Sequence, residues 1–420
     1  MLGEQVKLYS KFKFILFFSV FYLNSVSYVY ADTTSTSSSP KYPKAFKNLP
    51  YYKNLSIPLK YHKKFGVYTA NIQVDENNDL IDVIVDTGSP LLIILGNSAV
   101  CPKCKPYITK STIPNDLDIS LDLKQTVMDY GSEDDKIIQK KLKINFHKYD
   151  TPIQFDSHII TNGINTSNIL GISPVSKELE GISYLKNILN ILHLKEQFTF
   201  LLCGNKNNQL IIGSYQPQNE HKKPLTNVKR TSLSLDTFYT INLSGIEDHN
   251  GNPLVKYYPN NYAKAILDSG TGGLIVLPNN IYDFMIKYIR DYYKENNQSD
   301  RLTHEFWHNN YCVKSNFIIN DEFPDIKLSF PDYYNKHNNI TITLTPNKYI
   351  TEGGCGKGFR RLSFAHHNNY KSNVKHKKFL KQGEPDFFIL GTPIFEQYGI
   401  TFNLENKPKV KFFNKYFPCQ

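Results

Sequence analysis

Two short segments of the chain share one order of residue types, and they constrain the fold more than any other feature. Residues 83–89 (VIVDTGS) and 265–271 (AILDSGT) each run from apolar residues into Asp, a hydroxyl residue, Gly and a second hydroxyl residue. The apolar run has the length and composition of a buried strand, and Gly allows a sharp turn where a Cβ would clash. One copy alone is typical of an ordinary Asp–Gly turn. Two copies, nearly half a chain apart, predict that Asp86 and Asp268 end equivalent strands and face each other.

Two carboxylates held close together predict a particular chemistry. They cannot both ionise cheaply, so one pKa falls, the other rises, and the pair shares a proton. Such a pair can take a proton from a water that attacks a carbonyl and can protonate the leaving group. Gly88 and Gly270 form the two turns. We expect the remaining motif side chains to hydrogen-bond the outer carboxylate oxygens and so hold the pair in place: Thr87, Ser89, Ser269 and Thr271.

The two motifs resemble those of the pepsin-like aspartic proteases (family A1), and the resemblance covers the chain from about residue 60 to residue 419. It implies an all-β, bilobal fold with a few short helices and one catalytic Asp in each lobe. It also implies a monomeric aspartic endopeptidase that cleaves extended peptide or protein substrates at acidic pH, with no metal or organic cofactor. The Asn and Lys bias suggests plasmepsins as neighbours. The alternative is a catalytically inactive homologue that binds peptide or protein ligands.

Composition and charge narrow the classes of partner. A chain of 420 residues, 40% of them apolar, can fill two lobes. The net charge of +11 is spread along the chain and interleaved with Asn, which favours a solvated surface over a nucleic-acid site. Residues 356–385 form a long basic stretch with His366, His367 and His376. We interpret this stretch as a surface insertion; a metal site or a binding surface for anionic lipid or heparin is the alternative.

The start of the chain predicts export. Lys11 and Lys13 precede an apolar run too short to span a membrane, and small residues follow at Ala31. We therefore predict a signal peptide at 1–31, with an uncleaved anchor as the alternative and no other transmembrane segment. Residues 32–60 then form a short propeptide or linker, 61–200 the N-terminal lobe and 201–420 the C-terminal lobe. The expected location is the secretory pathway, secreted or in an acidic vacuole or vesicle. Five sequons are candidate glycan sites: Asn54, Asn165, Asn242, Asn297 and Asn339.

The resemblance also assigns a lid. Tyr130 and Gly131 match the tip of the β-hairpin flap that closes over substrate in the family and excludes water; a plain exposed hairpin is the alternative. Ile93 stands where the family often has Trp, Glu133 where it often has Gly, and Thr392 where it commonly has Asp. We hypothesise that Glu133 favours basic substrate residues.

Six cysteines in an exported chain allow 15 pairings. Spacing favours Cys101 with Cys104. The resemblance pairs Cys312 with Cys355, and Cys203 with Cys419 in a pattern like that of the memapsin branch. A redox-active Cys-x-x-Cys is the alternative, but no thioredoxin-like unit surrounds it, so structural disulfides are predicted.

Periodicity places the remaining elements. Apolar residues at helical spacing predict a helix over 182–192 and another just after Pro278, with Ile281, Phe284 and Met285 on its apolar face. Strands are predicted at 68–74, 81–85, 198–204, 209–213, 239–243, 400–403 and 410–412. The resemblance implies that 198–204 and 209–213 cross between the lobes. It also implies that the hydrophobic–Gly elements at 167–172 and 388–391 pack beneath the two Asp loops.

Overall fold

A computed structural model gives the fold of the 420-residue chain. The residues it describes are 53–74, 80–104, 112–113, 126–130, 133–146, 153–162, 167–174, 183–204, 207–215, 226–229, 238–259, 261–296, 302, 304–308, 311–314, 320–332, 338–353, 355, 357–366, 387–405 and 408–414. The predicted signal peptide, most of the predicted propeptide or linker, Gly131, Cys419, Asn165, Asn297 and residues 367–385 of the basic stretch lie outside these residues.

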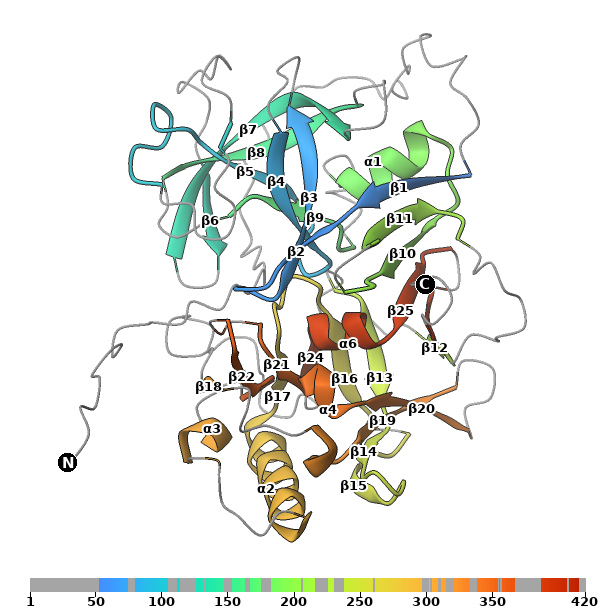
Figure 1. The fold of residues 1–420 in the computed structure, drawn as a ribbon. Coiled ribbons are helices and arrows are strands. Elements are labelled where there is room, and N and C mark those ends of the chain that lie inside the picture. Colours follow the sequence, from blue (N-terminus) through green and yellow to red (C-terminus); the bar gives the residue numbers. More distant parts are fainter. Residues whose placement is uncertain are drawn as a thin grey trace, which may run out of the picture.

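The chain forms a mostly β, two-lobed structure (Figure 1). The N-terminal lobe is an eight-stranded sheet in the order β2 (Lys60–His62), β3 (Val67–Val74), β4 (Leu80–Asp86), β9 (Ile169–Gly171), β5 (Leu92–Leu95), β8 (Ile153–Asn162), β7 (Glu133–Phe146) and β6 (Thr126–Tyr130). The C-terminal lobe contains a five-stranded sheet in the order β13 (Thr240–Leu243), β16 (Ala263–Leu267), β24 (Phe387–Leu390), β17 (Ile275–Leu277) and β23 (Phe364–His366).

Two smaller sheets complete the C-terminal lobe. One runs β15 (Pro253–Lys256), β14 (Gly245–Glu247), β19 (Ile326–Pro331) and β20 (Asn339–Leu344). The other runs β18 (Val313–Lys314), β22 (Phe359–Leu362) and β21 (Ile350–Thr351). The helices are short apart from α2: α1 (Tyr184–Ile191), α2 (Asn279–Asn296), α3 (His304–His308), α4 (Pro346–Tyr349), α6 (Thr392–Gln397) and the 3₁₀ helix η4 (Asn320–Glu322).

A six-stranded sheet contains both the first and the last strand of the described residues. Its order is β1 (Asn54–Pro58), β11 (Gln209–Gly213), β10 (Gln197–Leu201), β25 (Gly399–Asn403), β26 (Lys409–Phe413) and β12 (Thr226–Lys229). The strands predicted to cross between the lobes are thus β10 and β11, and the predicted closing strands are β25 and β26. Strand β1 falls in the stretch expected to be a propeptide or linker, and its Leu55 and Ile57 are buried.

The two large sheets repeat one topology. In β3–β4–β9–β5–β8 the successive pairings are antiparallel, parallel, antiparallel and parallel. The same series holds for β13–β16–β24–β17–β23. Asp86 is the last residue of β4, and Asp268 directly follows β16. The prediction that the two aspartates end equivalent strands is therefore confirmed at the level of topology.

Alternation along these strands separates the core from the carboxylate-bearing face. Ile81, Val83 and Val85 pack into the main core, whereas Ile84 and Asp86 point to the opposite face because successive side chains alternate. On that face, residues of neighbouring strands line up in two equivalent rows. The rows are Ile84, Ile169, Ile93 and His158 in the N-terminal lobe, and Ile266, Ile389, Val276 and Ala365 in the C-terminal lobe.

The predicted helices are present, with one error of orientation. Helix α1 begins after Ser183, whose hydroxyl accepts a hydrogen bond from the Lys186 N–H at 3.3 Å. Helix α2 starts immediately after Pro278, as predicted. Its buried side is shifted toward Tyr282 and Ile286, however, and Phe284 is 43% exposed, so the prediction for Phe284 was wrong.

Two predicted disulfides are formed, Cys101–Cys104 and Cys312–Cys355. Cys203 is also disulfide-bonded, and its predicted partner Cys419 lies outside the described residues. No helix in the described part of the chain has the length and apolar character needed to cross a membrane.

Candidate active site

Each aspartate is fixed by hydrogen bonds from its own turn. The Gly88 N–H donates to Asp86 Oδ1 at 2.7 Å and the Ser89 hydroxyl donates to Asp86 Oδ2 at 2.6 Å. The second loop repeats this pattern: the Gly270 N–H donates to Asp268 Oδ1 at 2.9 Å and the Thr271 hydroxyl to Oδ2 at 2.7 Å. An Asp side chain that bonds the backbone two residues on is a common turn device. Both carboxylates are therefore held in one orientation before any ligand binds.

The two carboxyl groups face each other across the lobes. A Cβ added to Gly88 would lie 2.8 Å from Asp268 Oδ1, and one added to Gly270 would lie 2.4 Å from Asp86 Oδ1. Each carboxyl therefore sits against the glycine of the opposite motif, where a larger residue would collide with it. The Asp86 and Asp268 side chains also share a hydrogen bond. The structure thus brings together the two residues that the sequence singled out.

The hydroxyls of Thr87 and Ser269 have a different role from the one predicted. The Thr87 hydroxyl donates to the Leu267 carbonyl and accepts from the Ser269 N–H, both at 2.8 Å. The Ser269 hydroxyl donates to the Val85 carbonyl at 2.8 Å and accepts from the Thr87 N–H at 3.0 Å. A hydroxyl has one proton to donate, so neither can also donate to a carboxylate. The prediction was right for Ser89 and Thr271 and wrong for Thr87 and Ser269, which bind the opposite lobe's backbone.

Burial and mutual charge control the proton affinity of the pair. Asp86 is 1% exposed and Asp268 is 2% exposed. Burial, followed by the negative charge of Asp86, raises the pKa of Asp268 well above the usual range of a carboxyl. Hydrogen bonds from Thr271 and Gly270 act in the opposite direction but do not cancel this effect. The pair therefore keeps a proton at pH values where a single exposed carboxyl would have lost it.

The predicted hydrophobic–Gly elements lie against the two Asp loops. The Gly171 N–H donates to the Leu91 carbonyl at 2.9 Å, and the Gly391 N–H donates to the Leu274 carbonyl at 3.1 Å. A Cβ added to Gly171 would lie 2.4 Å from the Leu91 backbone nitrogen, and one added to Gly391 would lie 2.2 Å from the Leu274 carbonyl oxygen. Only glycine lets the backbones approach this closely, so both elements support the Asp loops.

Three supporting residues were not predicted from the sequence. Asn168 is fully buried; its amide donates to the Asp82 carbonyl at 2.9 Å and its Oδ1 accepts from the Leu95 N–H at 2.8 Å. Thr392, noted only as a departure from the family, donates to the Gly66 carbonyl of the other lobe at 2.8 Å. The Tyr239 hydroxyl also crosses between the lobes, donating to the Ile172 carbonyl at 2.8 Å. Their partners are distant in sequence, so no local pattern indicates them.

The residue at the Trp position and its neighbour form a buried pair. Ile93 is fully buried and lies opposite His158 on β8. His158 is 7% exposed, and its Nδ1 has no hydrogen-bond partner. Burial lowers the pKa of His158 to about 4, and a hydrogen bond with the Leu92 backbone offsets this only in part. A single His inside a strand carries no sequence signal of such an environment.

The flap assignment is supported at the level of the backbone only. Strands β6 and β7 form an antiparallel hairpin in which Tyr130 pairs with Glu133. The side chains of both residues, and Gly131, lie outside the described part of the structure. The lid function of Tyr130 and Gly131 and the role of Glu133 stay predictions.

The sequence raised a metal site at the histidines of the basic stretch as an alternative. Within the described ranges, no group of three His, Cys, Asp or Glu could hold a metal ion. The His366 ring lies 5.0 Å from that of Tyr282, and burial lowers the His366 pKa. His367 and His376 lie outside the described residues.

These observations define a class: a duplicated, two-lobed β protein with a buried pair of carboxyls where the lobes meet. The family model described as "Eukaryotic aspartyl protease" matches residues 67–412. The chain belongs to this family of pepsin-like aspartyl proteases. A search of curated proteins found no match.

Proposed function

We propose that the protein is an aspartic endopeptidase in which Asp86 and Asp268 together activate one water molecule. The observation that carries the proposal is the crossed set of hydrogen bonds from Thr87 and Ser269, which holds two buried carboxyls against each other. Two buried carboxyls held this close can share one proton and act together on a water molecule. The raised pKa of Asp268 supports a pair that carries one proton and one negative charge.

The proposed reaction needs no covalent intermediate. The ionised carboxyl takes a proton from water while the water oxygen bonds to the peptide carbonyl carbon, and the protonated carboxyl donates its proton to the carbonyl oxygen. The tetrahedral intermediate then collapses: the carbon–nitrogen bond breaks, and the departing nitrogen takes a proton from the carboxyl that had deprotonated the water. One hydroxyl of the intermediate returns its proton to the other carboxyl, which restores the single proton of the pair. Because the two carboxyls titrate as one unit, the starting proton belongs to the pair.

The substrate in this proposal is an extended segment of about six to eight residues between the lobes, since strand-like peptides are bound through backbone contacts. Tyr130 and Gly131 would cover it as a flap, and Glu133 would favour basic residues. Replacing Glu133 by Gln should then reduce the preference in kcat/KM for basic over neutral peptides. An unchanged preference would show that Glu133 does not determine the selectivity for basic residues.

Location and processing are part of the proposal. Disulfides and family membership are consistent with the secretory pathway. We propose removal of 1–31 as a signal peptide and a two-lobe division at about residue 200. The disulfide-bonded state of Cys203 supports pairing with Cys419, as in memapsins, while kinship with plasmepsins rests on composition alone. Among the described sequons, Asn339 is exposed at the start of β20, whereas the Asn54 amide already donates to the Ser214 carbonyl at 2.8 Å.

The test is cleavage of a mixed peptide library at several pH values, with and without pepstatin. Wild type is compared with Asp86→Asn and Asp268→Asn, all disulfide-bonded and freed of the N-terminal segment. We expect cleavage by wild type alone and inhibition by pepstatin. A folded wild type that cleaves nothing would reject the enzyme and favour the inactive, peptide-binding homologue.

A further inference from the structure

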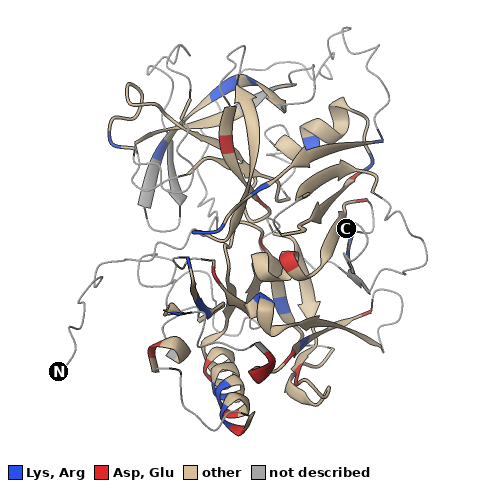
Figure 2. Ribbon diagram, in the orientation of Figure 1, with Lys and Arg blue, Asp and Glu red and all other residues tan. Residues whose placement is uncertain are grey.

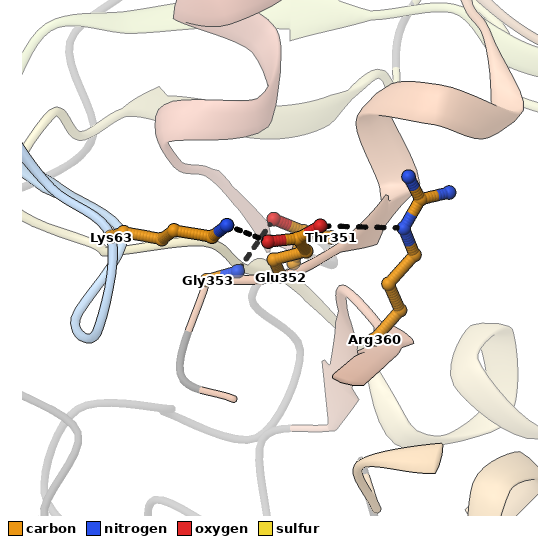
Figure 3. A network of polar contacts seen from close by, with 5 residues as sticks. All are labelled: Lys63, Thr351, Glu352, Gly353 and Arg360. Carbon is orange, nitrogen blue, oxygen red and sulfur yellow. Dashed lines mark hydrogen bonds and ion pairs between the residues drawn. The ribbon is translucent and has the colours of Figure 1, made fainter. Parts of the chain in front are cut away.

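An ion-pair network lies where the two lobes meet (Figure 3). The ammonium group of Lys63, in the turn between β2 and β3, pairs with Glu352, which follows β21. Arg360 on β22 lies on the other side of the same carboxylate, with Nε 3.9 Å from Glu352 Oε1. Two cations, one from each lobe, therefore share one carboxylate.

The network lies next to the loop that carries Asp268. A Cβ on Gly66 would lie 2.7 Å from Gly273 N, and one on Gly272 would lie 2.2 Å from the Phe65 carbonyl oxygen. Gly272 directly follows Thr271, whose hydroxyl binds Asp268. The Lys63 turn is thus packed on the backbone of the loop that carries Asp268.

Positive charge exceeds negative charge at this place. Lys64 is exposed beside Lys63, and its ammonium lies 5.0 Å from the centre of the Phe65 ring. Lys63 and Arg360 thus flank Glu352, Lys64 follows Lys63 in the same turn, and Figure 2 shows basic segments on both sides of the junction. The Lys63 side chain is 53% exposed and that of Glu352 is 28% exposed, so an incoming carboxylate can reach the cations.

We propose that Lys63, helped by Lys64 and Arg360, binds an acidic side chain of the substrate a few residues from the scissile bond. Glu352 competes internally for the same cations. Because the site binds a residue of a cleaved chain, this inference rests on the proposed function. It adds a charge preference that the carboxyl pair itself cannot supply.

A purely mechanical role for the ion pair makes a different prediction. If the pair only ties the lobes together, removing either partner should weaken the protein in the same way. If the cations bind substrate, Lys63→Gln removes the binding group, whereas Glu352→Gln removes its competitor. The two variants should then shift the preference for acidic peptides in opposite directions.

The experiment uses octapeptides in which Glu and Gln are exchanged at one position at a time. For wild type we expect one position at which Glu is preferred over Gln in kcat/KM by roughly two- to fivefold, the range of a partly exposed ion pair. Lys63→Gln should abolish that preference, Glu352→Gln should increase it, and added salt should weaken it. Lys287→Gln, which removes an exposed lysine paired with Asp291 on α2, is the matched control and should change nothing.

Two outcomes overturn the inference: no Glu preference at any position, or shifts of the same sign in Lys63→Gln and Glu352→Gln. Binding of the same peptides, labelled with fluorescein, to the Asp268→Asn variant separates this result from failure of the proposed function. Binding with a Glu preference but without any cleavage by wild type would reject the protease and keep the acidic-residue site. Cleavage without a Glu preference would keep the protease and reject the acidic-residue site.

Discussion

The buried imidazole of His158 predicts that the N-terminal lobe loses stability in acid. Burial lowers the pKa of folded His158 to about 4, against 6.5 for an ordinary imidazole. The unfolded chain therefore takes up the proton more readily than the folded chain. The stabilisation is complete above pH 6.5 and is lost as the pH falls toward 4. One pKa unit corresponds to about 1.4 kcal/mol, so the loss amounts to roughly 3 kcal/mol.

The test is urea unfolding at pH 7 and pH 4 for wild type and His158→Leu. Leu fits the apolar row beside Ile93 and carries no proton, so the variant should lose roughly 3 kcal/mol less than wild type over this range. The carboxyl pair is common to both proteins and cancels in the comparison. His304→Leu, which replaces an exposed histidine at the start of α3, should follow wild type.

Parallel loss of stability in wild type and His158→Leu would show that His158 is not responsible. If the prediction holds, the acidic optimum expected from the family comes with a stability cost in this lobe. The half-life of the folded protein would then shorten in the same pH range in which the carboxyl pair keeps its proton.

Three further outcomes follow from the site and the disulfides. Thr87→Val leaves a buried carbonyl and a buried N–H without partners and should lower the free energy of unfolding by about 2–4 kcal/mol; a loss under about 1 kcal/mol in urea would contradict this. In Gly270→Ala the new Cβ would lie 2.4 Å from Asp86 Oδ1, so peptide cleavage should fall at least about 100-fold with an unchanged circular dichroism spectrum, and near-normal kcat would refute the geometry. Replacing both cysteines of Cys312–Cys355, which closes a separation of 43 residues, should lower the free energy of unfolding by about 4 kcal/mol. Replacing both cysteines of Cys101–Cys104, with a separation of 3, should lower it by about 2 kcal/mol. A larger loss for Cys101–Cys104 than for Cys312–Cys355 in thermal unfolding would contradict this order.

Local sequence was enough to predict the parts of the site that depend on local structure. The apolar run before Asp86, the turn at Gly88 and the donor at Ser89 are within a few residues of one another, so propensity and turn chemistry determine them. Helix α2 was predicted for the same reason, because Pro278 and a helical period mark its start. The second motif then predicted the duplication, although the strands around it share little sequence.

Long-range contacts set the limit of that prediction. The Thr87 hydroxyl was expected to hydrogen-bond the carboxylate of its neighbour Asp86, yet its hydrogen-bond partners are on the other lobe. Asn168 and His158 likewise depend on strands that are adjacent only after the sheet has formed. Phe284 shows the same limit for a helix: periodicity predicts an apolar face, but the neighbouring elements decide which residues it buries.

The six-stranded sheet has a consequence for biosynthesis. It pairs β10, which is made before the second lobe, with β25, and β25 pairs in turn with β26, so strands made early and late lie in one sheet. The crossed bonds between Thr87 and Ser269 cannot form while the second half is still unmade. N-terminal segments of large proteins begin to fold during synthesis. A nascent or truncated chain that lacks the second half would therefore carry Asp86 without its counterpart, and the carboxyl pair would form only after the second half has been made.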